Sequence, residues 1–151
     1  MGYNPAVVGK FEILEHPADV GFRAYGMTLE ELFANAAEAL LTLACELDGI
    51  EEREQRTLYA SGGDLEALLF SWLAEILATG DSEGMVFRRA EVKELQPPGG
   101  SSGGEVRGVV YGEPFNRSRH RPGTYIKAVT YHQFRVERTD GGWSATVYLD
   151  V

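Results

Sequence analysis

The segment 64–77 reads DLEALLFSWLAEIL, and it decides the fold because it is the clearest helix in the chain. Asp64 is a suitable N-cap residue, and Thr79-Gly80-Asp81 is expected to end the helix. The apolar residues recur at three and four positions, as Leu65, Leu68, Leu69, Trp72, Leu73, Ile76 and Leu77. This spacing gives one apolar stripe, which must be buried against another layer of structure.

A second amphipathic helix is expected upstream of this one. Thr28 is a capping residue, and Glu30 and Glu31 follow it in the first turn, where acidic side chains are favourable. Apolar residues continue at helical spacing, as Leu29, Leu32, Phe33, Ala36, Ala37, Leu40 and Ala44. Asp48-Gly49 is expected to end this helix or the turn just after it.

The rest of the chain has the alternation and turn residues of β-strands. Strands are expected at 11–15, 20–25, 55–60, 85–87, 90–95, 105–111, 125–138 and 143–151. The last two flank the turn Asp140-Gly141 and form a hairpin, and the run 125–138 is expected to contain a bulge. Two helices cannot cover both faces of a wide sheet. The prediction is therefore an α+β fold, a two-layer sandwich with both amphipathic helices on one face of a mixed or mostly antiparallel sheet.

Length and composition limit the kinds of protein this can be. The 151 residues are expected to form a single domain (1–151), with a loosely ordered segment 1–9 and a flexible loop 97–104, PPGGSSGG. The net charge of −9, from 14 basic and 23 acidic residues, favours a basic protein partner over a nucleic acid. There is no long apolar run for a membrane span and no signal-peptide pattern, so we expect a cytoplasmic protein.

The single cysteine and the three histidines carry little catalytic signal. Cys45 excludes an internal disulfide and a cysteine-based metal site, and it is expected to be a buried core thiol. His16 lies at a strand end and could be a general base, a metal ligand or a structural hydrogen-bond partner. His132 shares an apolar strand face and is expected in the core. His120, in the basic loop 117–121, is expected to be solvated, and a solvated loop is favoured over a phosphate contact.

Carboxylates at two distant positions could form a cation site. The strand-like run 143–149 leads directly into Asp150 and Val151, so a final core strand would hold the Asp150 side chain beside the terminal carboxylate. Asp19 is the best candidate for a third carboxylate, although such connector residues often bond only local backbone. Oxygen ligands alone favour Ca²⁺, Mg²⁺ or Mn²⁺ over Zn²⁺. Lys127 is either an exposed lysine or a cation that balances these carboxylates.

Three segments, in the same order along the chain, resemble the signatures of the archease family. The first is HPADVGF at 16–22 with YG at 25–26 and TLEELFANAA at 28–37, the second is IKAVTYH at 126–132, and the third is YLDV at 148–151. The similarity runs from about Phe11 to the last residue. It is weakest across the loops 97–104 and 117–121.

This resemblance implies a non-catalytic activator of the GTP-dependent RNA ligase that joins tRNA halves by way of a 3′-phosphate end. Archeases promote guanylylation of that ligase, support multiple turnover and broaden its nucleotide use in tRNA splicing, so association with tRNA would be indirect. Mapped onto this chain, the family's metal ligands are Asp19, Asp150 and the terminal carboxylate of Val151. The lysine implicated in activation is Lys127, and His16 of the first signature is grouped with it.

Two residues depart from the family pattern, and two other functions stay open. Pro17 stands where the family commonly has Thr, and Val151 where it commonly has Ile, but neither change removes a ligand oxygen. One alternative is a small metal-dependent phosphohydrolase that uses Asp19, Asp150 and His16 around a metal-bound water. The other is a protein-binding module whose ion is structural.

Overall fold

The structure is a computed structural model that describes residues 9–15 and 20–151. The predictions for 1–8 and for the connector 16–19 lie outside the described residues. The elements of the described part are β1 (Phe11–Glu15), β2 (Val20–Gly26), α2 (Leu29–Ala44), the 3-10 turn η1 (Leu47–Gly49), β3 (Glu54–Gly62), α3 (Leu65–Glu83), β4 (Met85–Gln96), β5 (Gly104–Pro114), β6 (Ala128–Thr139) and β7 (Gly142–Asp150). No helix of this part is long and apolar enough to cross a membrane.

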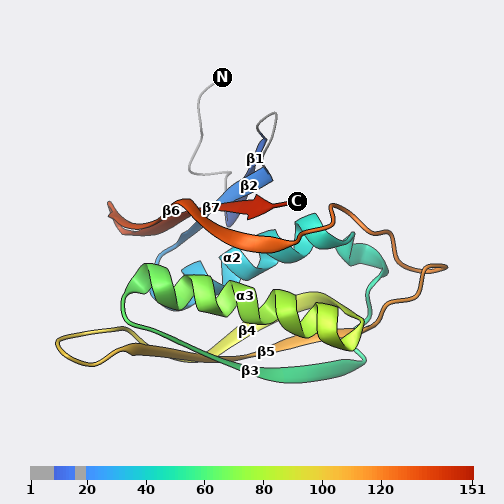
Figure 1. Cartoon of the computed structure of the whole chain (residues 1–151), viewed down its shortest axis with the longest axis horizontal. Coiled ribbons are helices and arrows are strands. Elements are labelled where there is room, and N and C mark those ends of the chain that lie inside the picture. The colour runs from blue at the N-terminus through green and yellow to red at the C-terminus, as the bar shows by residue number, and fades with distance from the viewer. Residues whose placement is uncertain (1–8, 16–19) are drawn as a thin grey trace.

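The strands form two antiparallel sheets, with the orders β1-β2-β7-β6 and β3-β5-β4. Helices α2 and α3 lie between the two sheets (Figure 1) and contact strands of both. The predicted α+β class, with two helices and antiparallel strands, is confirmed. The arrangement differs from the predicted single sheet with both helices on one face. There are two sheets, and each helix packs against strands of both, so that apolar side chains are buried toward two layers.

Both helices begin at the predicted capping residues. The Thr28 hydroxyl accepts a hydrogen bond from the Glu31 amide at 3.1 Å, and the Asp64 carboxylate accepts one from the Ala67 amide at 2.8 Å. Each bond satisfies a backbone N–H that the first turn of a helix leaves unpaired. The two predicted N-termini are therefore confirmed.

Helix α3 continues past its predicted end at 79–81. It runs to Glu83, and Gly84 then adopts a left-handed conformation with φ 64°, which costs glycine less than any other residue. Gly80 is an interior residue of the helix, where a Cβ would lie 3.3 Å from the carbonyl oxygen of Met85. The sequence rule that glycine stops a helix was wrong here because this glycine serves close packing against β4.

The core is centred on Trp72 of α3, which is fully buried. Its indole N–H donates to the carbonyl oxygen of Phe33 at 3.1 Å, so the two helices are joined by a buried hydrogen bond. Gly108 on β5 makes room for the ring, because a Cβ there would lie 2.5 Å from an indole carbon. The other large, fully buried side chains include Phe22, Phe33, Leu32, Leu40, Leu68, Leu69, Leu73, Ile76 and Leu149.

Strand β6 contains the predicted bulge. Its register with β7 shifts between Thr130 and Arg135, and within the bulge Gln133 has a positive φ of 54°. The bulge interrupts the strict alternation of side chains. His132 is therefore exposed, and the prediction that it lies in the core was wrong.

Candidate functional site

At the end of β7, described residues of all three signature segments pair with one another. Leu149 of β7 pairs with Val20 of β2 on one side and with Val129 of β6 on the other. The backbone N–H of Lys127 donates to the carbonyl oxygen of Asp150 at 2.7 Å. The beginnings of β2 and β6 thus flank the end of β7.

Val20, the residue that follows Asp19 in the sequence, is the residue of the first signature that pairs with the end of β7. His16 and Asp19 themselves lie outside the described residues, so their predicted roles stay predictions. Within the described ranges, no group of three or more His, Cys, Asp or Glu side chains could hold a metal ion. That finding leaves Asp19 aside and does not bear on a site that includes it.

The last two residues of the chain, Asp150 and Val151, are exposed, so their carboxylate oxygens are accessible as metal ligands. Leu149 is only 2% exposed and belongs to the core, whereas Val151 is 40% exposed and Asp150 is exposed. Because side chains alternate along a strand, Thr146 and Asp150 lie on the face of β7 that is turned away from the helices. Exposed carboxylate oxygens fit a hard divalent cation, which takes oxygen ligands and retains water.

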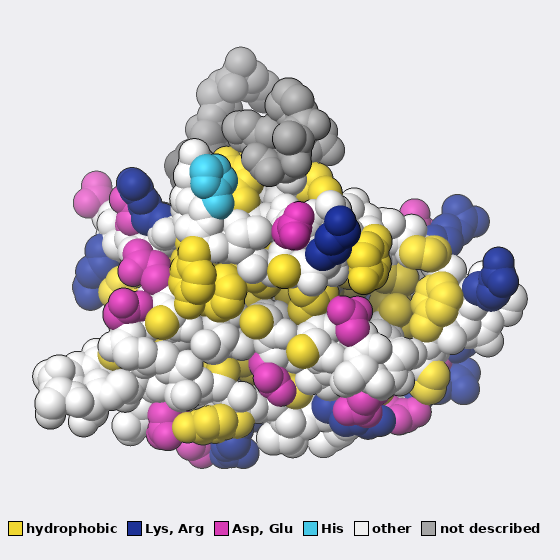
Figure 2. All heavy atoms as spheres, in the orientation of Figure 1, with side chains coloured by type: hydrophobic (Ala, Val, Ile, Leu, Met, Phe, Trp, Pro, Cys, Tyr) yellow, Lys and Arg dark blue, Asp and Glu magenta, His cyan; other side chains and the backbone are white. Residues whose placement is uncertain are grey.

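Lys127 is exposed. It lies between Asp150, to which its backbone bonds, and an open groove that its side chain helps to line. The groove has a volume of about 300 Å³ and runs between α3 and the beginning of β6. It is lined by Phe70, Ala74, Leu77, Ala78, Asp81, Lys127, Ala128 and Val129. Figure 2 shows hydrophobic side chains in a band across the middle of this view, between the two sheets. Lys127 is thus a surface cation beside apolar side chains.

Among the residues that the structure describes, Glu113 and His120 form a buried ionisable pair that sequence reasoning missed. Glu113 is 1% exposed and His120 is 2% exposed. The backbone N–H of Asn116 donates to Nδ1 of His120 at 2.8 Å. Nε2 of His120 therefore carries the proton and donates to the Glu113 carboxylate at 2.9 Å. The prediction of a solvated His120 was wrong because the basic loop folds back onto Glu113.

Further donors surround the Glu113 carboxylate. The Glu51 amide donates to it at 2.8 Å, the Arg119 guanidinium donates to its other oxygen, and Nε of Arg53 lies at 3.3 Å. The Glu51 N–H, followed by Arg119 and His120, outweighs burial and lowers the pKa of Glu113 to about 2. Both oxygens are occupied, so the cluster anchors the loop. The sequence held no motif that could have indicated it.

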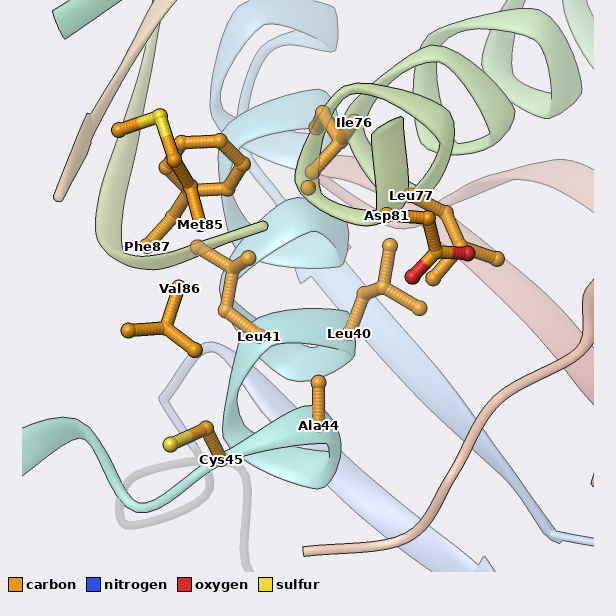
Figure 3. Close-up of a pocket in the computed structure, with 11 residues that line it drawn as sticks. Leu40, Leu41, Ala44, Cys45, Ile76, Leu77, Asp81, Met85, Val86 and Phe87 are labelled. Atoms are coloured by element: carbon orange, nitrogen blue, oxygen red, sulfur yellow. The ribbon is translucent and has the colours of Figure 1, made fainter. Parts of the chain in front are cut away.

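Figure 3 shows a small cavity between α2, α3 and β4, with Cys45 at its edge. Its volume is about 80 Å³, and its lining is apolar apart from Asp81. Cys45 is 3% exposed and its thiol donates to the carbonyl oxygen of Arg121 at 3.2 Å. Burial raises the pKa of the Cys45 thiol. The predicted buried core thiol is confirmed, and the cavity offers no convergent polar groups for catalysis.

Known proteins similar to this chain cover nearly all of it. The Archease protein family matches residues 11–151. The archease of Methanopyrus kandleri is 45% identical over 141 residues, which are 93% of this chain and 99% of that protein. The archease of Pyrococcus furiosus is 41% identical over 143 residues, or 94% of this chain and 99% of the relative.

Two solved structures share the fold. The solution structure of Methanobacterium thermoautotrophicum protein 1598 is 32% identical, has a TM-score of 0.78 and covers 94% of this chain and 99% of its own. The crystal structure of a Thermotoga maritima protein, described as an archease and possible chaperone, has a TM-score of 0.59 at 23% identity. It covers 93% of this chain and 96% of its own. That second likeness bears on the fold alone. With the family match over residues 11–151 and relatives above 40% identity, this chain belongs to the archease family.

Proposed function

We propose that this chain is a non-catalytic protein cofactor of the GTP-dependent RNA ligase that joins tRNA halves through a 3′-phosphate end. It promotes guanylylation and multiple turnover of the ligase and broadens its nucleotide use. The observation that supports this most directly is the meeting of the signature segments at the end of β7, where Lys127 N–H bonds the Asp150 carbonyl oxygen at 2.7 Å.

In this proposal Asp19, Asp150 and the terminal carboxylate of Val151 hold a divalent cation. Adjacent carboxylates repel one another, and a cation relieves that repulsion. When bound, a Ca²⁺, Mg²⁺ or Mn²⁺ ion would supply a positive centre at the surface of an acidic protein. Val20 and Leu149 support the arrangement because their pairing brings the residue after Asp19 beside the residue before Asp150.

The charges of the chain fit a role in docking on a basic protein. A net charge of −9 steers it toward a positively charged partner. Lys127 stands next to Asp150 and beside the apolar groove, so one surface offers a cation, carboxylates and apolar contacts. Nucleotidyl transfer depends largely on positioning and charge neutralisation. A second protein can therefore assist it without contributing a nucleophile, and its association with tRNA would pass through the ligase.

The test follows covalent guanylylation of the cognate ligase with labelled GTP and a divalent cation, with and without this chain. Asp150→Asn and Lys127→Gln are expected to abolish most of the stimulation and to leave the fold intact, because both side chains are exposed. Asp140→Asn is the matched control. It removes the same charge from the exposed turn at the other end of β7.

Equal guanylylate yield with and without the chain would refute the proposal. An equal loss in Asp140→Asn would show that overall charge, and no particular site, is responsible. Metal-dependent hydrolysis of phosphodiesters by the chain alone, lost in Asp150→Asn, would favour the hydrolase instead. A lowered melting temperature with full stimulation in Asp150→Asn would favour a structural ion.

A further inference from the structure

The outer face of the four-stranded sheet carries a polar basin of about 420 Å³. It is lined by Arg23, Gln133, Arg135, Glu137, Thr146 and Tyr148, from β2, β6 and β7. The neighbours of Arg23 along β2, Phe22 and Ala24, are fully buried. Alternation therefore turns Arg23 away from the helices and onto the opposite face of the sheet.

Two arginines of the basin stand in one row across three strands. Thr146 of β7 pairs with Arg23 of β2 on one side and with Arg135 of β6 on the other. Neighbouring strands are about 4.8 Å apart, so the two arginine positions are about 10 Å apart with Thr146 between them. Nε of Arg23 already donates to the Thr146 hydroxyl at 3.2 Å. Two arginine positions thus flank Thr146.

The bulge of β6 adds a neutral donor to the lining of the basin. Gln133 has a positive φ of 54°, a conformation that is costly for a residue with a side chain. Among the described residues it is the one non-glycine with positive φ. The bulge places Gln133 beside Arg135 in the lining of the basin. An amide side chain there adds N–H donors to those of the arginines.

The acidic partners of these arginines are exposed, and their contacts with the arginines are long. Arg23 lies 3.4 Å from Glu12, and Arg135 lies 3.8 Å from Glu137, with all four side chains more than a third exposed. Pairs of this kind contribute little stability. Arg107 of the other sheet, by contrast, makes an ion pair of 2.6 Å. The guanidinium N–H groups of the basin are therefore available to a better acceptor.

We propose that this basin binds a phosphate oxyanion, with Arg23 and Arg135 as charged donors and Thr146 and Gln133 as neutral ones. Paired guanidinium groups match the oxygens of a phosphate in geometry and charge. The phosphate could belong to a free nucleotide or to the end of an RNA. The proposal goes beyond the ligase role, because it concerns other residues and is measured on the chain alone.

The net charge of −9 lowers the affinity that is expected of this site for an anion. Long-range repulsion weakens binding of an anion, while the local arginines attract it within a Debye length of about 10 Å at 0.1 M salt. We therefore expect dissociation constants in the millimolar range at low salt, and weaker binding as salt is added. Asp150 lies on the same face of β7, about 13 Å from Thr146 along the strand.

The experiment is a titration of the ¹⁵N-labelled chain, followed by two-dimensional NMR in metal-free, low-salt buffer. The probes are pyrophosphate, GTP, and a short RNA with either a 3′-phosphate or a 3′-hydroxyl. The amide signals of Arg23, Arg135 and Thr146 are expected to shift in a saturable way. Preference for GTP would identify a nucleotide phosphate, and preference for the 3′-phosphorylated RNA would identify an RNA end.

Three substitutions make the test specific. Arg135→Gln is expected to weaken pyrophosphate binding by roughly tenfold, the loss of one charge-assisted hydrogen-bonding group. Glu137→Gln removes a competing carboxylate and is expected to tighten binding severalfold. Arg138→Gln is the matched control, because its guanidinium lies over the Trp143 ring at 4.7 Å and outside the basin.

Three results would overturn the proposal. The first is the absence of saturable shifts at the basin amides. The second is an equal weakening in Arg135→Gln and Arg138→Gln, which would indicate general electrostatics. The third is acetate binding as tightly as pyrophosphate, which would indicate a carboxylate site. None of these would affect the guanylylation assay, which depends on Asp150 and Lys127.

Discussion

Replacing Leu149 with Ala tests whether the end of β7 is anchored by the core. Leu149 is 2% exposed and pairs with both Val20 and Val129. The substitution removes three buried carbon atoms, which corresponds to roughly 2.4 kcal/mol at about 0.8 kcal/mol for each. A residual cavity raises the cost, but a strand end can relax into part of the space. We expect a loss of about 3 kcal/mol, in the lower part of the range for Leu→Ala.

The measurement is urea unfolding followed by circular dichroism, with the slope of the transition unchanged. A loss of about 3 kcal/mol corresponds to a decrease in Tm of roughly 6–12 °C for a domain of this size. Asp150→Ala is the control, since it changes the next residue at an exposed position and should alter the free energy of unfolding by less than about 0.5 kcal/mol. A cost below about 1 kcal/mol for Leu149→Ala, or an equal cost for both variants, would refute the reasoning.

Three further outcomes are expected. The pKa of Glu113 is lowered from 4.5 to about 2, so its contribution to stability is present above pH 4.5 and is lost as the pH falls toward 2. In urea unfolding, the free energy of unfolding of Glu113→Gln should therefore decrease less than that of the unchanged chain between pH 4.5 and about pH 2. An identical dependence on pH in the two proteins would contradict the assignment. Cys45 should react with a disulfide reagent at pH 8 far more slowly in the native than in the urea-unfolded chain, because burial raises its pKa and blocks access; equal rates would exclude a buried thiol. Appending two glycines after Val151 should weaken divalent-cation binding in calorimetry by moving the terminal carboxylate, and unchanged affinity would remove Val151 from the proposed site.

The helices illustrate what could be predicted from local pattern. The apolar stripe of α3 and the caps Thr28 and Asp64 depend on residues within one or two turns of each other, so the sequence alone indicates them. The end of α3 could not be predicted in the same way. Gly80 is a close-packing residue against β4, and that contact exists only in the folded chain.

The histidines show the limit of residue-by-residue interpretation. The environment of His120 is set by Glu113 and by the backbone of Asn116, which the loop brings together. No periodicity marks such a contact. His132 was misplaced because alternation was carried through a bulge that shifts every later side chain of β6.

The sequence by itself determined the α+β class, the two amphipathic helices, the hairpin at Asp140-Gly141 and, through three ordered segments, the archease family. These features depend on short-range patterns that are visible in the printed chain. Only the tertiary structure decided that the strands divide into two sheets around the helices, and that Arg23 and Arg135 flank Thr146. Apart from the hairpin and the other pairs of consecutive strands, these pairings join strands that are far apart in the sequence, and their free energy depends on packing across the whole core, so no local pattern specifies them.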